Sequence, residues 1–239
     1  MQTQSVASPA IAEDYLARLN LEGNRKVWQL NHPKIGYVVR KVRPRLTCGM
    51  KVAEFGVGDA YLPSRLGPGM SYTGLDISSY LAEYHSRHST GVTSNARFLQ
   101  MDIADPQGYG LEEQDVVFCL DVLEHVSERE YRLAIHNIHR LLRPGGLFIG
   151  TVPYRENLDL QMVRCPDCGC EFHRIGHKQS FDMARLKGTL QPKFTILELG
   201  IVPPVPGRLR SCRAVIRWAR YHLIGFRPGD TCYFVAQRL

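Results

Sequence analysis

The sequence predicts an α/β protein built on a parallel sheet, and three observations carry this prediction. From residue 50 onward, short apolar segments alternate with segments of helical periodicity. The first apolar segment ends in a glycine loop, Gly56-Val-Gly58, and Pro144-Gly-Gly146 separates a helical segment from the next apolar one. Such alternation is typical of βαβ units, whose strands lie parallel in one sheet.

The composition fits one globular domain with additions. The chain has 239 residues, of which 44% are hydrophobic and 22% are charged. This length supports one buried core, and no long acidic or low-complexity tract favours disorder. The formal net charge of +7 favours anionic partners. An ordinary enzyme can carry such an excess, so charge admits nucleic acid as a partner without favouring it.

The sequence also predicts a cytoplasmic location. Residues 1–14 show no basic segment followed by an apolar one, so we expect no signal peptide. There is no run of about 18 apolar residues that predicts a membrane-spanning helix. The chain has seven cysteines, and the Cys-x-x-Cys spacing favours metal binding in a reducing compartment over a disulfide framework.

Residues 1–46 are expected to form an N-terminal helical cap, and residues 47–239 the main domain. The cap has two predicted helices, at Ala10–Leu21 and at about Pro33–Val42. Basic residues from Lys34 to Arg45 interleave with apolar ones at helical spacing. This pattern favours a helix that covers a sheet edge or closes over a pocket, rather than an arm for nucleic acid.

The remaining elements are predicted in chain order from short apolar runs and helical periodicity. The predicted strands are Lys51–Phe55, Tyr72–Asp76, Ala96–Met101, Asp115–Leu120, Gly146–Val152, Phe194–Leu199 and Cys232–Ala236. The predicted helices are Ser79–His88, Glu128–Leu142 and Phe181–Leu190. Two insertions interrupt the alternation, a Cys/His segment at 153–179 and a basic segment at 203–229.

A nucleotide-type site is predicted at the end of the first strand. The glycines permit a tight turn and the close approach of a ligand to the backbone. Asp76 ends the second strand, where a carboxylate can accept hydrogen bonds from ribose hydroxyls. These features also fit NAD. However, Tyr61 stands where the dinucleotide pattern needs a small residue, and a nicotinamide fold does not need the Asp121-Val-Leu-Glu-His125 segment.

Together with Leu142–Leu147, these segments resemble the class I S-adenosylmethionine-dependent methyltransferases, especially the small-molecule branch. The resemblance is strong over about residues 50–152 and weak over 180–239. Its motifs, in order, are Val52–Ala60, Gly74–Ser78, Met101–Ile103, Asp115–Val126 and Leu142–Leu147. It implies a Rossmann-like, doubly wound sheet of seven strands, mostly parallel, with the last strand antiparallel. Ala60 departs from the family, which usually has a third glycine there.

The resemblance also implies where S-adenosylmethionine binds. The expected cofactor-binding residues are Glu54, Gly56, Gly58, Asp76, Ile77, Asp102, Ile103, Leu120 and Asp121. The glycine loop would face the methionine part, Asp76 the ribose, and Asp102 with Ile103 the adenine. Leu120 and Asp121 would line the methionine side. The alternative is that the glycines form a plain turn and the two aspartates cap helices.

His125 is the candidate general base. Methyl transfer from a sulfonium is an in-line displacement that depends mainly on positioning and desolvation. An oxygen acceptor usually also needs a base, and an imidazole with a pKa of about 6.5 suits that task. The alternative is that the Glu124-His125 pair belongs to the fold.

The Cys/His segment predicts a structural zinc ion. Cys165-x2-Cys168-x4-His173-x3-His177 offers four ligands for a tetrahedral site, with Cys170 as an alternative ligand. The competing interpretations are free thiols in a loop, or His177 acting in the pocket. The segment leaves the carboxyl edge of the fifth strand, so in either case it can shape the acceptor pocket.

Residues 207–225 are predicted to form a basic amphipathic helix. It could pack on the domain, lie on an anionic membrane or contact RNA phosphates. Three functions therefore compete. The first is methylation of a small molecule or of a glycoconjugate sugar, on oxygen; the second is RNA methylation; the third is a zinc-stabilised scaffold that binds the cofactor without catalysis. The intact cofactor motifs argue against the third.

Overall fold

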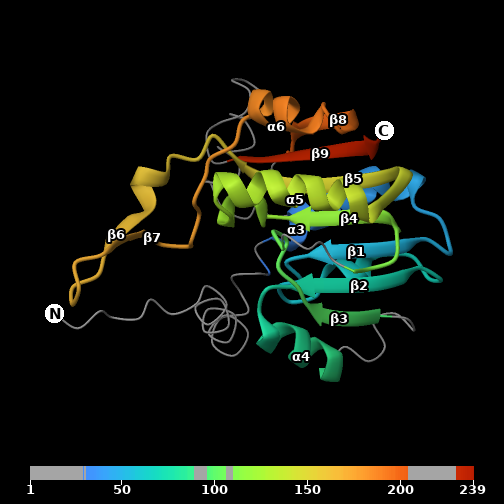
Figure 1. Ribbon diagram of the computed structural model, residues 1–239, viewed down its shortest axis with the longest axis horizontal. Coiled ribbons are helices and arrows are strands. Elements are labelled where there is room, and N and C mark those ends of the chain that lie inside the picture. The colour runs from blue at the N-terminus through green and yellow to red at the C-terminus, as the bar shows by residue number, and fades with distance from the viewer. Residues whose placement is uncertain (1–28, 30, 89–95, 106–109, 204–229) are drawn as a thin grey trace, which may run out of the picture.

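The structure, a computed structural model, describes residues 29, 31–88, 96–105, 110–203 and 230–239 (Figure 1). The strands are β1 Lys51–Phe55, β2 Ser71–Asp76, β3 Ala96–Gln100, β4 Gln114–Leu120, β5 Leu142–Tyr154, β6 Met162–Arg164, β7 Glu171–His173, β8 Phe194–Ile201 and β9 Asp230–Arg238. The helices are α3 His32–Val42, α4 Ser79–His88, α5 Glu128–Leu141 and α6 Met183–Leu190. Short 3₁₀ turns lie at η2 Arg43–Arg45, η3 Leu62–Arg65, η4 Leu123–His125 and η5 Leu158–Gln161.

Seven strands form one sheet in the order β3-β2-β1-β4-β5-β9-β8. The neighbours from β3 to β5 are parallel, whereas β9 is antiparallel to both β5 and β8. The predicted fold class is confirmed, including the antiparallel last strand and an N-terminal helix. The chain reverses its direction of winding between β1 and β4, and open α/β sheets bind ligands at the carboxyl ends of strands at such a switch point.

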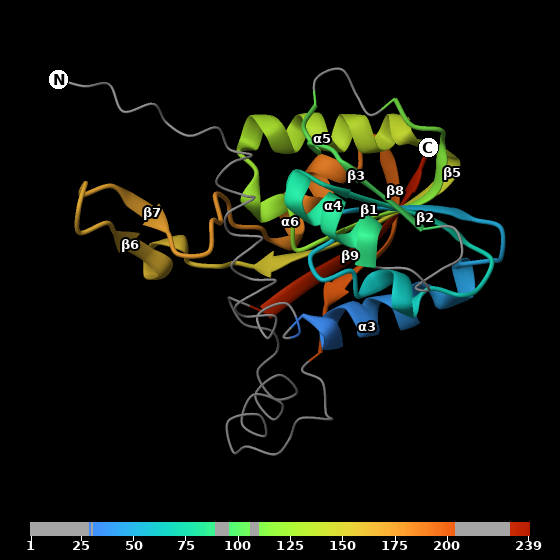
Figure 2. The same ribbon diagram turned by 90° about the horizontal axis from the view of Figure 1, so that it is seen from below.

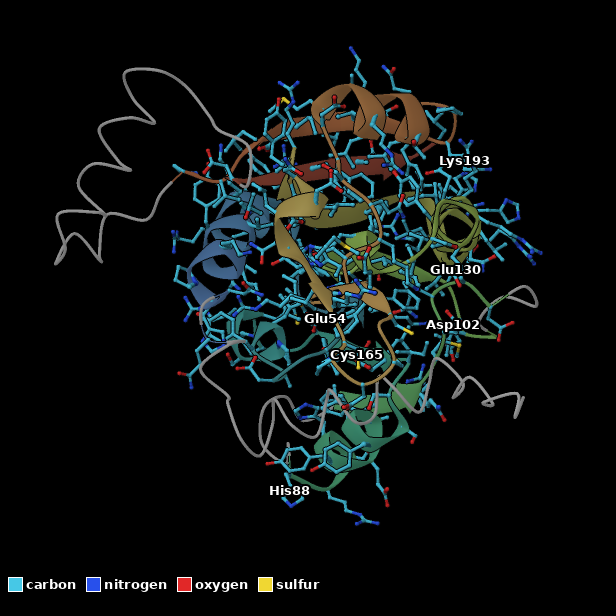
Figure 3. The ribbon with its side chains drawn as sticks, turned by 90° about the vertical axis from the view of Figure 1, so that its left-hand side faces the viewer. Glu54, His88, Asp102, Glu130, Cys165 and Lys193 are labelled. Atoms are coloured by element: carbon cyan, nitrogen blue, oxygen red, sulfur yellow. The ribbon has the colours of Figure 1, made fainter. Side chains whose placement is uncertain are left out.

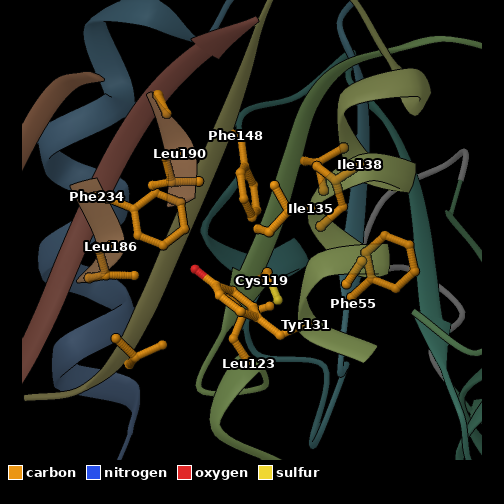
Figure 4. Close-up of a cluster of buried hydrophobic side chains, with 14 of the residues drawn as sticks. Phe55, Cys119, Leu123, Tyr131, Ile135, Ile138, Phe148, Leu186, Leu190 and Phe234 are labelled. Atoms are coloured by element: carbon orange, nitrogen blue, oxygen red, sulfur yellow. The ribbon is translucent and has the colours of Figure 1, made fainter. Parts of the chain in front are cut away.

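Helices cover both faces of the sheet (Figure 2). On one face α5 and α6 bury a cluster around Tyr131, Phe148 and Phe234, shown in Figure 4. On the other face α3 and α4 bury a second cluster, which includes Val38 and Leu81. Two apolar layers on one sheet explain why the central strands are buried along nearly their whole length.

Helix α5 shows why the sequence folds locally as predicted. Its N-terminus is a capping box in which the Ser127 N–H donates to the Glu130 carboxylate (2.6 Å) and the Glu130 N–H donates to the Ser127 hydroxyl (3.4 Å). An apolar stripe from Tyr131 to Leu141 then faces the sheet. The helix ends one residue earlier than predicted, because Leu142 already pairs with Gln114 of β4.

Three segments differ from the sequence prediction. The Pro144–Gly146 stop lies inside β5 as an irregularity in its pairing with β4. Helix α6 begins at Met183 rather than Phe181, because the Asp182 side chain accepts the Arg185 N–H (2.8 Å) as the N-cap. The Cys/His segment contains a hairpin of β6 and β7, which the sequence did not predict.

Two predicted helices, Ala10–Leu21 and 207–225, lie outside the described residues. The RNA and membrane interpretations of the 207–225 segment therefore stay untested. Among the residues that the structure describes, there is no helix with the length and apolar character needed to span a membrane.

Gly150, in the middle of β5, gives a test of core packing. A Cβ at this position would lie 2.3 Å from Phe234 Cζ and 3.0 Å from the Cys119 carbonyl oxygen. We expect Gly150→Ala to lower the free energy of unfolding by about 1–3 kcal/mol through overpacking. Gly188→Ala in α6 is the control, since nothing lies within 4 Å of its Cβ position, and we expect stabilisation of about 0.5–1 kcal/mol. Urea denaturation measures both, and equal effects would contradict this packing.

A carboxyl group is buried between β1 and β2. Glu54 is 3% exposed and accepts a hydrogen bond from the hydroxyl of Tyr72, which is also buried. Burial raises the pKa of Glu54 to about 8, although the hydrogen bond from Tyr72 opposes this shift. Glu54 is therefore largely protonated at neutral pH in the folded protein.

This raised pKa predicts a pH-dependent stability. Between the ordinary value of 4.5 and about 8, the unfolded chain releases the proton that folded Glu54 retains. The free energy of unfolding therefore falls as pH rises through this window, at roughly 1.4 kcal/mol for each unit of pKa difference. Glu54→Gln keeps the acceptor for Tyr72 but does not titrate. We expect its stability advantage over the wild type to grow from pH 4 to pH 8 in urea denaturation; a pH-independent difference would refute the account.

Candidate functional site

The carboxyl ends of β1, β2 and β4 meet at the switch point, and the predicted cofactor residues follow these strands. Figure 3 views this edge of the sheet and labels Glu54 and Asp102 on it. Glu54 and Leu120 are themselves buried in the strands, whereas Gly56, Gly58 and Asp121 are partly exposed. The accessible groups at the edge are therefore those of the loops.

The glycine loop after β1 contacts the loop after β4. Gly56 has φ +74° and Gly58 has φ +51°, so both backbones are in the left-handed region that favours glycine. A Cβ at Gly56 would lie 2.3 Å from Cγ2 of Val122. The contact between the two loops, and not only the conformation of the turn, therefore requires glycine at position 56.

Asp76 holds the glycine loop in place. One carboxylate oxygen accepts the Val57 N–H (3.0 Å) and the other accepts the Ser78 N–H (2.9 Å). The alternative that Asp76 caps α4 does not hold, because the Ser78 hydroxyl accepts the Leu81 N–H (3.2 Å) at the start of that helix. Asp76 is thus a buried carboxylate at the carboxyl edge that joins β2 to the loop after β1.

The predicted adenine-side residues occupy two environments. Asp102 is exposed and accepts the Ala104 N–H (2.8 Å) in the turn after β3. The Ile103 side chain is 6% exposed and belongs to the apolar cluster under α5. Ile77 is partly exposed beside Asp76. Asp102 and Ile77 thus present side chains at the edge, whereas Ile103 can offer only its backbone.

Asp121 is held from two sides in an unusual backbone conformation. Its φ of +56° is rare for a residue other than glycine and is found mainly at functional sites. One carboxylate oxygen accepts the Lys34 ammonium (2.7 Å) and the other accepts the Thr151 hydroxyl (2.9 Å). Sequence reasoning identified Asp121 but neither of its partners.

Helix α3 is fixed to the same edge. Its His32 lies 2.7 Å from the Asp59 carboxylate in the glycine loop and stacks on Tyr61 at 3.7 Å between ring centroids. With Lys34, it ties the start of the cap to both loops. That this helix closes over a pocket stays a prediction. The sequence placed Lys34 in a basic helix but did not indicate these contacts with the two loops.

Two histidines and two glutamates gather beside His125 and form what we call the histidine–glutamate cluster: Glu124, His125, Glu156, His173 and His177. His177 Nδ1 lies 2.5 Å from a Glu156 carboxylate oxygen, and His177 Nε2 lies 4.0 Å from Glu124 Oε1. The His125 ring meets the His177 ring edge-on at 4.7 Å. Of these five residues, the sequence indicated only His125 and His177 as candidates for the acceptor pocket.

His125 is a poor general base by itself. Burial and, to a smaller extent, the neighbouring His177 together lower its pKa to about 4. At neutral pH the ring is therefore uncharged and binds a proton only weakly. The expected catalytic role of His125 receives no support from its electrostatics.

The predicted zinc ligands do not come together. The cysteines lie at the tip of the β6–β7 hairpin, where the Cys165 N–H donates to the Cys170 carbonyl (2.8 Å) and Cys168 is exposed (Figure 3). His173 pairs with Met162 at the other end of the hairpin ladder. Among the described residues, no group of three metal-ligand atoms within 4.8 Å of one another includes a cysteine. The hairpin therefore separates the predicted cysteine ligands from the predicted histidine ligands.

Comparisons with known proteins agree with the fold and the motifs. Residues 53–150 match the family model described as a methyltransferase domain. A ubiquinone biosynthesis O-methyltransferase of Vibrio atlanticus is 30% identical over 144 residues, which are 59% of this chain and 59% of that protein. The chain thus matches about three fifths of this relative's length.

Solved structures show the same architecture over nearly the whole chain. Magnesium protoporphyrin IX methyltransferase from Synechocystis, with bound S-adenosylhomocysteine, is similar at a TM-score of 0.64 and 18% identity, covering 96% of this chain and 99% of that one. A chain from the complex of the Haloferax volcanii Trm112 methyltransferase activator with a methyltransferase has a TM-score of 0.64 and 18% identity, covering 94% and 98%. At these identities the likeness concerns the fold. Residues 53–150 therefore carry the sequence pattern of a methyltransferase domain, on the Rossmann-like fold of the class I S-adenosylmethionine-dependent methyltransferases.

Proposed function

We propose that this chain is an S-adenosylmethionine-dependent methyltransferase that methylates an oxygen atom of a small molecule, free or as a sugar of a glycoconjugate. The observation that carries the proposal is the meeting of the glycine loop, Asp76 and Asp121 at the switch point of this sheet. The curated relatives named O-methyltransferases support oxygen as the acceptor atom.

The residues at the carboxyl edge fit the groups of the cofactor. Asp76 can accept hydrogen bonds from ribose hydroxyls, and the exposed Asp102 can accept one from the adenine amino group. The backbone at Gly56 and Gly58 lets the methionine part approach closely, and the Lys34 ammonium can pair with its carboxylate. S-adenosylmethionine supplies an electrophilic methyl group on a sulfonium.

The acceptor side of the site is assigned to the histidine–glutamate cluster. Glu124 and His125 follow Asp121 by only a few residues, so the cluster adjoins the end of the cofactor site where the methyl group would lie. Transfer forms an O–C bond, breaks an S–C bond, and requires the acceptor hydroxyl to lose its proton to solvent. His125 alone is a weak base, so we assign the activation of the hydroxyl to the cluster as a unit.

We predict that the wild type binds S-adenosylhomocysteine and that Asp76→Asn weakens this binding by about tenfold or more. The loss follows because a hydrogen bond to a charged group contributes about 1.5–3 kcal/mol, and 1.4 kcal/mol is tenfold in affinity. Glu112→Gln is the matched control, since Glu112 is exposed and pairs with Lys51 at the opposite edge of the sheet. Isothermal titration calorimetry measures all three proteins. Absence of binding by the folded wild type would overturn the proposed function.

The acceptor class is tested by incubating the full chain and methyl-labelled S-adenosylmethionine with separated small-molecule, glycoconjugate and RNA fractions. We expect label in the small-molecule or glycoconjugate fraction, in an alkali-stable methyl ether. Label that appears only in RNA would replace the proposal with RNA methylation. Binding of the cofactor without transfer to any fraction would favour the non-catalytic scaffold instead.

A further inference from the structure

Glu124 is a buried carboxyl group that lacks a partner. Its side chain is 1% exposed, and neither carboxyl oxygen has a hydrogen-bond partner within the described part of the chain. Buried carboxyl groups are normally paired, hydrogen-bonded or bound to metal, because burial without a partner is costly. Something that satisfies both oxygens is therefore to be expected here.

His177 presents a free ring nitrogen to this carboxyl. Its Nδ1 lies 2.5 Å from Glu156 Oε2, so Nδ1 donates to that carboxylate and Nε2 carries a lone pair. Nε2 lies 4.0 Å from Glu124 Oε1. An imidazole held by a carboxylate through one nitrogen, with the other nitrogen free, is the usual arrangement of a metal-bound histidine.

His125 completes a set of three ligands. One ligand atom each from Glu124, His125 and His177 lies within 4.8 Å of the others. The Nδ1 side of the His125 ring lies beside Gly176, where a Cβ would be 3.4 Å from Nδ1. In the neutral ring one nitrogen carries a lone pair and can bind an ion. In a tetrahedral site, bonds of about 2.0–2.2 Å place the ligand atoms about 3.3–3.6 Å apart, so small side-chain movements would bring these three atoms onto one ion.

A second group, Glu156 with His173 and His177, fits a metal less well. His173 Nδ1 accepts the His177 N–H (3.0 Å), so in the neutral ring the proton sits on Nε2, which then cannot bind a cation. The 2.5 Å separation of Glu156 from His177 Nδ1 is a hydrogen bond and leaves no place for an ion between them. These residues position His177.

We propose that Glu124, His125 and His177 bind one divalent transition-metal ion, with Glu156 as the outer carboxylate that orients His177. Two imidazoles and one carboxylate suit Zn²⁺, Fe²⁺ and related ions, and such a set leaves coordination positions open. Glu124 and His125 follow Asp121 within one short loop, residues 121–125. The role of the ion rests on the proposed function: it would bind an acceptor hydroxyl and lower the pKa of that hydroxyl.

Metal titration of the full-length chain, stripped with a chelator, tests the proposal. We expect one Zn²⁺ per chain in calorimetry. Glu124→Gln and His177→Asn remove ligands and should each weaken Zn²⁺ binding by at least about tenfold, and Glu156→Gln should weaken it by roughly 10–100-fold. The control is the Cys165→Ser, Cys168→Ser double variant, which alters the thiols at the hairpin tip and should keep wild-type affinity.

Co²⁺ as a second probe separates the two possible sites by spectroscopy. We expect visible d–d bands without a thiolate-to-cobalt band in the near ultraviolet, and loss of the bands in Glu124→Gln. A thiolate band, or a stoichiometry that follows the cysteines, would overturn the proposal, as would Zn²⁺ affinity that all three cluster substitutions leave unchanged. S-adenosylhomocysteine binding by each variant shows that the variant is folded. If the wild type binds metal but not S-adenosylhomocysteine, the metal-site proposal stands and the methyltransferase proposal is wrong.

Discussion

Contact between the loop after β1 and the loop after β4 is the constraint on which the site depends. Gly56 has no room for a Cβ because Val122 lies against it, so the loops that follow the two central strands are in contact. Asp76 fixes the first loop through Val57, and Lys34 with Thr151 fixes the second through Asp121. Contacts within the chain, from β2, α3 and β5, thus hold this edge, and such fixed positions are what a positioning-dependent reaction needs.

One short loop, residues 121–125, connects the two halves of the site. At its start Asp121 contacts Lys34 and Thr151, and at its end Glu124 and His125 belong to the histidine–glutamate cluster. The proximity is also electrostatic, because the charges of Asp121 and Lys34 both act on the pKa of Glu124. The base of the hairpin supplies His177 from a distant part of the sequence. Under the proposed function, the segment 153–179 would contribute to the acceptor side through its histidines rather than through its cysteines.

Periodicity and glycine placement predicted most of the sheet, because buried strands and their turns leave strong local patterns. Asp76 was predictable since its distance from the glycine loop follows from one βαβ unit. Lys34 and Thr151 were not, because their contacts with Asp121 depend on how a helix and a strand far away in sequence meet the loop. Glu156 and Glu124 carried no motif that marked them as a pair around His177.

The structure does not bring the predicted zinc ligands together, for a physical reason that spacing cannot show. The spacing of the predicted ligands suggested one loop from Cys165 to His177, in which all four could converge. A three-residue ladder instead pairs Arg164 with Glu171 and Met162 with His173. The cysteines thereby occupy the turn and His173 the far end. Likewise, Ile103 followed the adenine motif in sequence, yet its side chain completes the core beneath α5.

Hydrogen–deuterium exchange with and without S-adenosylhomocysteine reports which backbone segments the cofactor contacts. We predict slower exchange in peptides that cover residues 55–60, 76–80, 101–104 and 120–125, which lie at the carboxyl ends of β1 to β4. Peptides at the amino edge, around residues 110–115, should exchange at the same rate in both samples. Protection confined to other segments, or none at a saturating ligand concentration, would contradict a cofactor site at the switch point.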